Sequence, residues 1–238
     1  MLGGRGRPPL RFDTLLKRGI MSNIKIAPSI LSADFGKMAE EVRRMEVAGA
    51  DLLHCDVMDG VFVPNITFGP KMIADIRKVT KLPLDVHLMI VEPEKYVEAF
   101  AKAGANYITI HVEATKKLVP TLKAIRALGV KSGAVISPDT PVGEIEPALE
   151  YSDMVLLMSV YPGFGGQKFL DKSLARLEEL TALVKKSKRK IDIEIDGGIT
   201  LDNIAEIKKA GANVIVAGNT IFGANNPKET ITALRSRA

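Results

Sequence analysis

From residue 21 onward, short runs rich in β-branched residues alternate with amphipathic segments. A repeat of two in apolar and polar positions indicates a strand, whereas a repeat near 3.6 indicates a helix. The pattern predicts strands near 24–28, 52–57, 84–89, 107–112, 131–136, 154–158, 191–196 and 213–217. It predicts helices near 36–48, 69–79, 93–103, 116–128, 141–149, 169–187, 201–210 and 228–236. The chain therefore consists of repeated β-then-α units.

A recurring sequence at the junction between a helix and the next strand supports this division into β-then-α units. The segments Ala48-Gly49-Ala50-Asp51, Ala103-Gly104-Ala105-Asn106 and Ala210-Gly211-Ala212-Asn213 each close a helix pattern and open a strand. Glycine suits the left-handed position that ends a helix. Alternating βα units require a parallel sheet, and eight of them close most simply into a (β/α)8 TIM barrel. An open doubly wound sheet is the rival, disfavoured because the first unit has no G-x-G-x-x-G turn.

The first twenty residues differ in kind from the rest. They hold five of the 33 basic residues but one of the 28 acidic residues, with Gly-Gly and Pro-Pro and no apolar periodicity. We interpret 1–20 as a disordered leader outside the fold and 21–238 as a single catalytic domain. Residues 21–238 then carry 28 basic and 27 acidic residues. This balance argues against nucleic acid as a partner, although the whole chain has a net charge of +5.

Membrane insertion and disulfide chemistry are not expected. No apolar run reaches the roughly 18 residues that a spanning helix needs. Cys55 is the only cysteine, which favours a reducing, cytoplasmic location. Strand parity turns Cys55 away from its neighbours His54 and Asp56, so we expect a buried apolar filler rather than a reactive thiol.

The residues that carry candidate chemistry fall at predicted strand ends. His54 and Asp56 lie two apart near the end of one strand, His87 ends the next, and Asp196 ends the seventh. In a barrel, all four would point inward at the mouth where such folds place their active sites. Two imidazoles and two carboxylates suit one divalent metal ion, with zinc, iron(II), manganese or cobalt as candidates. The alternative is a set of core histidines satisfied by neighbouring acids.

Glycine-rich turns follow the last three strands, as Gly163-Phe164-Gly165-Gly166, Gly197-Gly198 and Gly218-Asn219. Glycine lets backbone N–H groups approach an anion, and a short helix near Asn219 would add its positive end. Loops after strands seven and eight are a usual phosphate site in these barrels. The pattern favours a phosphorylated substrate, with the segment 161–164 as a candidate mobile lid.

Other residues at inward-facing or strand-end positions have more than one possible role. On strand seven, Asp192 and Glu194 should face the barrel interior. There each carboxylate needs either a hydrogen bond or a position near the solvent-exposed end of the barrel opposite the mouth. His111 ends the fourth strand, and a supporting or structural role is favoured over metal ligation. Met58, Met89 and Met158 share the inward parity and are either pliable packing or a soft lining around a charged intermediate.

Longer motifs add a family resemblance. The segments A-P-S-I-L-S-A-D-F (27–35), H-C-D-V-M-D-G (54–60), F-V-P-N (62–65), D-V-H-L-M (85–89), M-S-V (158–160), P-G-F-G-G-Q (162–167) and D-G-G (196–198) together resemble ribulose-phosphate 3-epimerases. The resemblance runs from about residue 24 to the C-terminus. It implies a TIM barrel, a catalytic divalent metal, and interconversion of D-ribulose 5-phosphate and D-xylulose 5-phosphate in the pentose phosphate pathway.

The resemblance also implies residue roles. His54, Asp56, His87 and Asp196 match the family's metal ligands, with Asp56 and Asp196 as proton acceptor and donor. Ser29 and His87 match substrate contacts, together with the phosphate-holding Gly163, Phe164, Gly165, Gly166, Asp196, Gly197, Gly198, Gly218 and Asn219. Met58, Met89 and Met158 match a sulfur-lined cavity. A homo-oligomer is expected, with a small ketose phosphate as the molecule bound.

Two positions depart from the family pattern, and three other functions stay open. Asn219 stands where serine commonly follows Ala-Gly, and Tyr161 stands where asparagine or an acid is frequent. The first alternative is 3-epimerisation of a six-carbon ketose phosphate such as D-allulose 6-phosphate. The others are a phosphate-binding barrel isomerase or lyase with one base, and a non-catalytic sugar-phosphate sensor.

Overall fold

Eight parallel strands form the centre of the structure, a computed structural model that describes residues 24–237. The strands are β1 (Lys25–Pro28), β2 (Leu53–Met58), β3 (Leu84–Met89), β4 (Tyr107–His111), β5 (Lys131–Ile136), β6 (Met154–Met158), β7 (Asp192–Asp196) and β8 (Val214–Ala217). Each lies within a residue or two of its expected place. The proposed leader, 1–20, falls outside the described residues.

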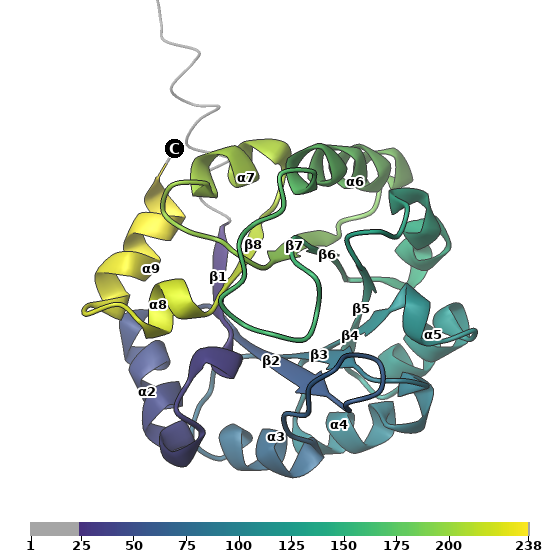
Figure 1. The fold of residues 1–238 in the computed structure, drawn as a ribbon. Helices are drawn as coiled ribbons and strands as arrows, with labels where there is room; N and C mark the ends of the chain where they lie inside the picture. The colour runs from purple at the N-terminus through teal and green to yellow at the C-terminus, as the bar shows by residue number, and fades with distance from the viewer. Residues whose placement is uncertain (1–23, 238) are drawn as a thin grey trace, which may run out of the picture.

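The sheet curves into a barrel rather than spreading as an open sheet (Figure 1). Hydrogen-bonded pairs run in sequence from β2 through to β8, and β8 pairs back onto β1. Between β1 and β2 the contact is short. It consists of a bridge between Ser29 and His54, with the Asp51 N–H donating to the Ile26 carbonyl at 2.9 Å. The doubly wound alternative is therefore wrong.

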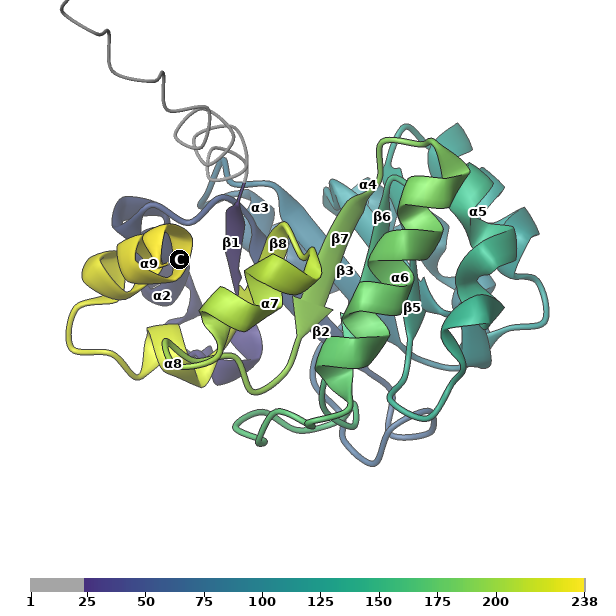
Figure 2. The same ribbon diagram turned by 90° about the horizontal axis from the view of Figure 1, so that it is seen from above.

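Helices surround the barrel on its outside (Figures 1 and 2). The α-helices are α2 (Met38–Ala48), α3 (Pro70–Arg77), α4 (Val97–Ala103), α5 (Leu118–Ala127), α6 (Ser173–Ser187), α7 (Ile204–Ala210), α8 (Asn219–Phe222) and α9 (Pro227–Ser236). The 3₁₀ helices are η1 (Ile30–Ser32), η2 (Phe35–Lys37), η3 (Pro93–Lys95), η4 (Val112–Ala114) and η5 (Val142–Tyr151). No helix among residues 24–237 is long and apolar enough to cross a bilayer.

The three matching joints behave as the sequence predicts. Gly49, Gly104 and Gly211 end α2, α4 and α7 with φ values of 88°, 103° and 117°. Because L-residues with a β-carbon rarely adopt this left-handed conformation, each glycine stops its helix and sends the chain into the next strand.

One helical segment differs from its expected form. The segment expected near 141–149 is the 3₁₀ helix η5, which contains Pro147. Proline lacks the N–H that an α-helical hydrogen bond needs, so the tighter, irregular turns replace a regular α-helix.

Strand parity separates two environments. Leu53, Cys55 and Val57 of β2 point outward and join one large apolar cluster with helix residues such as Val42 and Met45. This confirms Cys55 as a buried filler. The intervening residues of β2 point into the barrel, which is why polar side chains collect there.

Candidate active site

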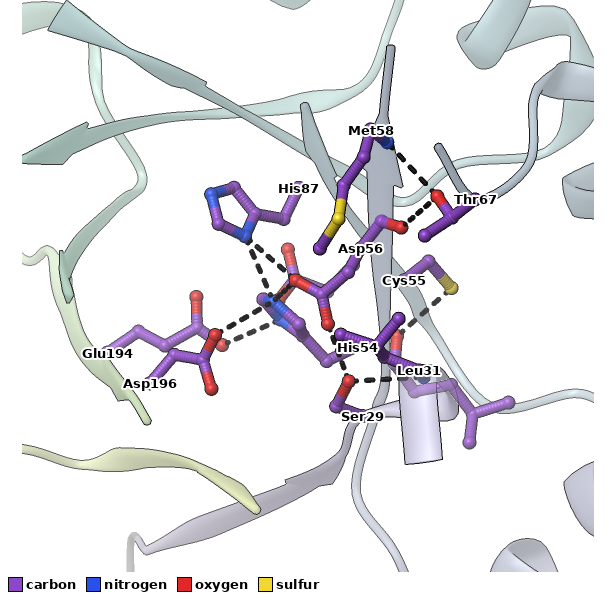
Figure 3. A network of polar contacts seen from close by, with 12 residues as sticks. Ser29, Leu31, His54, Cys55, Asp56, Met58, Thr67, His87, Glu194 and Asp196 are labelled. Carbon is purple, nitrogen blue, oxygen red and sulfur yellow. Dashed lines mark hydrogen bonds and ion pairs between the residues drawn. The ribbon is translucent and has the colours of Figure 1, made fainter. Parts of the chain in front are cut away.

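The register between β2 and β3 brings the first three candidate residues together. Asp56 pairs with His87, and His54 pairs with Asp85, so the inward residues of both strands meet inside the barrel. Asp196 enters from the opposite side as the last residue of β7. One ligand atom from each of His54, Asp56, His87 and Asp196 lies within 4.8 Å of the others. Figure 3 shows these side chains turned toward one another.

Short polar contacts join the cluster. The Nδ1 atom of His87 lies 3.1 Å from Oδ1 of Asp56, and the Nε2 atom of His54 lies 3.3 Å from the same oxygen. Oδ2 of Asp196 is 4.0 Å from Nε2 of His54. The Ser29 hydroxyl donates to Oδ2 of Asp56 at 2.5 Å. The hydroxyl therefore orients one carboxylate oxygen while the other faces the imidazoles (Figure 3).

The two carboxyl groups differ in proton affinity. Burial opposes ionisation of Asp56, but the His54 and His87 imidazoles outweigh it and hold the pKa of the Asp56 carboxyl below its ordinary value. Burial, followed by the negative charge of Asp56, raises the pKa of Asp196 to about 7. At neutral pH the pair therefore contains one ionised acid and one acid close to its own pKa.

The two imidazoles also differ. Burial opposes the charged form of His54, yet Asp56 and Asp85 outweigh it and raise the pKa of His54 well above its ordinary value. For His87, burial dominates and lowers the pKa to about 4. The Nδ1 atom of His54 lies 2.7 Å from Oδ2 of Asp85. A carboxylate on the far nitrogen of an imidazole is the arrangement that orients histidines toward metals.

The donor set fits a divalent cation. Two imidazole nitrogens and two carboxylates converge from β2, β3 and β7. The pKa of Asp196 is raised first by burial and then by the charge of Asp56, and a cation would stabilise both carboxylates. Nitrogen and oxygen donors in this ratio suit borderline ions such as Zn²⁺ and also first-row ions such as Mn²⁺.

A cavity of about 430 Å³ opens at the mouth of the barrel above the cluster. Most of the residues predicted for the site line it, namely Ser29, Asp56, Met58, Met89, Met158, Gly163, Phe164, Gly165, Gly166, Asp196, Gly197, Gly198, Gly218 and Asn219. His54 and His87 do not line it, because both are fully buried beside Asp56. The three methionines are at most 3% exposed.

Close backbone approach explains glycine at two turns. A β-carbon on Gly198 would lie 2.2 Å from the backbone nitrogen of Phe169, and its φ of +65° is left-handed. A β-carbon on Gly218 would lie 2.3 Å from the Ser32 hydroxyl. The expected short helix is α8, which begins at Asn219. The Asn219 side chain accepts a 2.6 Å hydrogen bond from Ser32, so the loops after β1 and β8 are joined at the cavity wall.

The loop between β6 and α6 covers part of the barrel mouth (Figures 1 and 2). The Gln167 amide donates to the carbonyls of Tyr161 and Phe164, at 2.6 and 2.9 Å, and so closes the loop on itself. Tyr161, which departs from the family pattern, donates its hydroxyl to Oδ1 of Asp139 at 3.2 Å. That contact ties the loop to the segment after β5 rather than to the cavity floor.

The two interior acids of β7 behave differently from each other. Asp192 accepts from Lys25 at 2.6 Å and from Asn213 at 2.7 Å, as the sequence requires. Glu194 is fully buried, and its Oε1 lies 3.5 Å from Nδ1 of His54, but neither carboxyl oxygen has a hydrogen-bond partner among residues 24–237. The expectation is wrong for Glu194. Burial, with the charge of Asp85, raises the pKa of Glu194 well above its ordinary value and so favours the protonated carboxyl over the expected hydrogen-bonded carboxylate.

Sequence reasoning gave no role to several residues that support the site. Asp85 holds His54, Ser32 holds Asn219, and Glu113 lies 3.0 Å from His111, which in turn contacts His87. Strand parity could have identified Asp85, because it is two residues before His87 and therefore shares its inward direction. Ser32 and Glu113 lie just after strands, where no local periodicity shows direction.

The comparisons with known proteins agree with the geometry. Residues 25–222 match the model of the ribulose-phosphate 3 epimerase family. Ribulose-phosphate 3-epimerase of Bacillus subtilis is 48% identical over 213 residues, covering 89% of this chain and 98% of that protein. The enzyme of the same name from Synechocystis is 51% identical over 216 residues, covering 90% and 94%.

Among solved structures, a 3-hexulose-6-phosphate synthase shares the fold with a TM-score of 0.64 and 19% identity, covering 90% of this chain and 98% of that one. Its likeness concerns the barrel alone. The family match and the two relatives instead extend over most of the sequence, including every strand that contributes to the cluster. The chain therefore belongs to the ribulose-phosphate 3-epimerase family.

Proposed function

We propose that this chain interconverts D-ribulose 5-phosphate and D-xylulose 5-phosphate by inverting C3, as an isomerase of the pentose phosphate pathway. The observation that carries the proposal is the convergence of Asp56 and Asp196 on one cavity from β2 and β7. Inversion needs a proton removed from one face of the carbon and another supplied on the opposite face. Two acids on facing sides of a barrel satisfy that requirement, whereas a one-base isomerase or lyase would not need both.

The two carboxyl groups have different roles in proton transfer. Asp56, whose pKa is lowered, is the base that takes the C3 proton of D-ribulose 5-phosphate. Asp196, whose pKa is raised to about 7, is the acid that returns a proton to the other face. Removal of the proton α to the C2 ketone leaves a cis-enediolate. After one turnover the proton positions are exchanged, which makes the same pair competent for the reverse reaction.

His54, Asp56, His87 and Asp196 would hold the divalent cation, with Zn²⁺, Fe²⁺, Mn²⁺ and Co²⁺ as candidates. When bound, the cation supplies Lewis-acid stabilisation of the negative charge that develops on the substrate oxygens. Ser29, which directly follows β1, holds Asp56 in place through its 2.5 Å hydrogen bond and lines the cavity. Met58, Met89 and Met158 surround the reacting carbons with thioethers that donate no hydrogen bond.

The glycine turns after β6, β7 and β8 bind the substrate phosphate in this proposal. They meet on one side of the cavity, where Gly166, Gly198 and Gly218 all lie in its wall. Phosphate is remote from C3, so its binding energy serves to orient the sugar rather than to react. Phe164, which is half exposed on the loop after β6, then closes over the bound ketose and excludes water.

The relatives reported above bear the ribulose-phosphate name, and the six-carbon alternative, epimerisation of D-allulose 6-phosphate, is not favoured.

We also propose a homo-oligomer in the cytoplasm. The apolar Val61 and Ile66, on the loop after β2, are 73% and 75% exposed and are available for contacts between copies. Size-exclusion chromatography with light scattering tests the assembly.

A single experiment tests the reaction. Purified protein is incubated with D-ribulose 5-phosphate in D₂O, and C3 is followed by NMR. Deuterium should enter C3 as D-xylulose 5-phosphate forms, and a chelator should abolish both events. Turnover that persists after complete metal removal would exclude the role of the cation. Binding of the ketose phosphate without any deuterium exchange at C3 would favour the hypothesis of a non-catalytic sugar-phosphate sensor.

A further inference from the structure

His111 connects the metal-ligand cluster to an acid outside it. It ends β4 and is fully buried. Its ring meets that of His87 edge to edge, with 5.0 Å between centroids and 23° between the ring planes, and Phe62 lies 4.8 Å away. Its Nε2 atom lies 2.9 Å from Nε2 of His87. Its Nδ1 atom lies 3.0 Å from Oε2 of Glu113 and 3.2 Å from the Ser137 hydroxyl.

We propose that Glu113 and His111 are positioning residues that keep the proton of His87 on Nε2 and so leave its Nδ1 lone pair free to bind the metal. The inference rests on the proposed function, because it takes His87 as a metal ligand. It adds two residues that act through His87 and do not touch the substrate.

The number of protons in the chain of contacts carries the argument. A nitrogen–nitrogen separation of 2.9 Å is a hydrogen bond, which needs one proton between the two Nε2 atoms. The Nδ1 atom of His87 is the nitrogen turned toward the cluster, 3.1 Å from Oδ1 of Asp56 and 3.4 Å from Nε2 of His54. A cation bound among these atoms would replace any proton shared between Nδ1 and the Asp56 carboxylate. For that atom to offer a lone pair in a neutral ring, the proton of His87 must be on Nε2. His87 is then the donor, and Nε2 of His111 must accept.

The charge of Glu113 makes Nε2 of His111 the acceptor in the hydrogen bond with His87. An ionised carboxylate has no proton to give, so the nitrogen of His111 that faces it must donate. A neutral His111 with its proton on Nδ1 has a lone pair on Nε2, as the contact with His87 requires. Burial opposes the charge of Glu113, but His111 and the donors from Thr140 and Ser137 lower the pKa of Glu113 to about 2. The acid therefore stays ionised at neutral pH.

The orientation of Glu113 is fixed by its second oxygen. Oε1 accepts from the backbone N–H of Ser137 at 2.8 Å and also from the Thr140 hydroxyl. These donors hold Oε1 away from the histidine and turn Oε2 toward it. In Glu113→Gln the amide oxygen should remain with the two donors, which places the NH₂ group against Nδ1 of His111. His111 must then move its proton to Nε2, where it opposes the N–H of His87.

The test compares Glu113→Gln with the matched control Glu94→Gln in the full chain. Glu94 has similar side-chain exposure, 21% against 26%, and accepts from Thr115 at 2.9 Å on a neighbouring loop. Zn²⁺ alone is titrated into each metal-free protein. We expect Glu113→Gln to bind Zn²⁺ about 10- to 100-fold more weakly than wild type, the usual effect of losing such a supporting partner. Glu94→Gln should match wild type.

A spectroscopic measurement separates this role from simple packing. In ¹⁵N NMR of the Zn²⁺-loaded wild type, His111 should carry its proton on Nδ1, and in Glu113→Gln on Nε2. His111→Gln, which can place a carbonyl oxygen near the His87 N–H, should retain more Zn²⁺ affinity than His111→Phe, which keeps a planar ring beside Phe62 but offers no acceptor.

Two results distinguish the possible failures. Equal Zn²⁺ affinity in wild type and Glu113→Gln, or a wild-type His111 protonated on Nε2, would overturn this inference and leave the proposed function standing. A wild-type protein that binds no Zn²⁺ and epimerises the ketose without any metal would overturn both.

Discussion

The Nδ1 atom of His87 lies 3.1 Å from Oδ1 of Asp56, its register partner on the adjacent strand. The contact places an imidazole beside the acid that must stay ionised, whereas Asp196 on β7 is buried, lies 4.0 Å from the nearest imidazole of the cluster and keeps its proton more readily. The barrel thus gives two chemically identical side chains different proton affinities through their neighbours.

Replacing one acid at a time should separate exchange from inversion. In Asp196→Asn, Asp56 can still remove the C3 proton of D-ribulose 5-phosphate, so deuterium should enter C3 from D₂O without formation of the other epimer. In Asp56→Asn, exchange should occur from D-xylulose 5-phosphate instead. Net epimerisation should fall by about 10²-fold or more in both, because each lacks one general acid–base group. NMR of both ketoses measures this.

The bound metal content of each variant is the control, since both acids are proposed ligands and loss of the cation would remove both activities. Epimerisation at the wild-type rate in either variant would contradict the two-acid mechanism.

The pH dependence of the metal-free protein should report the unusual state of Asp196. Its pKa is raised to about 7, whereas aspartate in an unfolded chain titrates near 3.9. Between these values the native state retains a proton that the unfolded state has released. The contribution of Asp196 to the free energy of unfolding therefore decreases as the pH rises from about 4 to about 7. Asparagine does not titrate, so Asp196→Asn should become more stable relative to wild type over that window.

Urea unfolding of both metal-free proteins at several pH values checks this. Asp56 is present in both, so its opposite contribution largely cancels in the difference. A stability difference that stays constant with pH, or that favours wild type as the pH rises, would contradict the assignment.

Gly218 should be sensitive to added volume rather than to backbone strain. Its φ of −91° is open to any residue, but a β-carbon would lie 2.3 Å from the Ser32 hydroxyl. Gly218→Ala should therefore displace the phosphate-binding wall and raise KM about tenfold, a cost of about 1.4 kcal/mol that is typical of overpacking. Ser32→Ala removes the clashing oxygen, so the double variant should recover part of the loss.

Steady-state kinetics of the two single variants and the double variant measure this coupling. The same rise in KM for Gly218→Ala with and without the Ser32 hydroxyl would show that the predicted clash is not the cause.

Cys55 should be unreactive in the folded protein. It is fully buried among apolar side chains, and burial raises the pKa of its thiol. A thiol reagent should label it slowly in the native protein and rapidly after denaturation. Cys55→Ser should lower the free energy of unfolding by about 1–3 kcal/mol, because a hydroxyl replaces the thiol in an apolar site. KM should be unchanged, since the side chain points away from the cavity.

The measurement is mass spectrometry of labelled samples alongside urea unfolding and kinetics. Fast labelling of the native protein would contradict the outward orientation.

The sequence by itself determined the parts of this protein that depend on local chemistry. Period-two alternation placed His54 and Asp56 on one face of a strand and Cys55 on the other, and the structure agrees. The glycine joints at Gly49, Gly104 and Gly211 marked helix ends, because a left-handed φ is a property of one residue and its neighbours. These signals established the number and order of the βα units and which side chains face inward.

Only the tertiary structure decided which inward residues meet and how they are charged. The register of β2 on β3 and closure of the barrel set the distances from Asp56 to His87 and Asp196. Those distances, with burial, separate the pKa values of the two acids. Local pattern could not reveal the raised pKa of Glu194 or the contact from Glu113 through His111 to His87. The reason is that hydrogen bonding and desolvation depend on side chains brought together from distant parts of the chain.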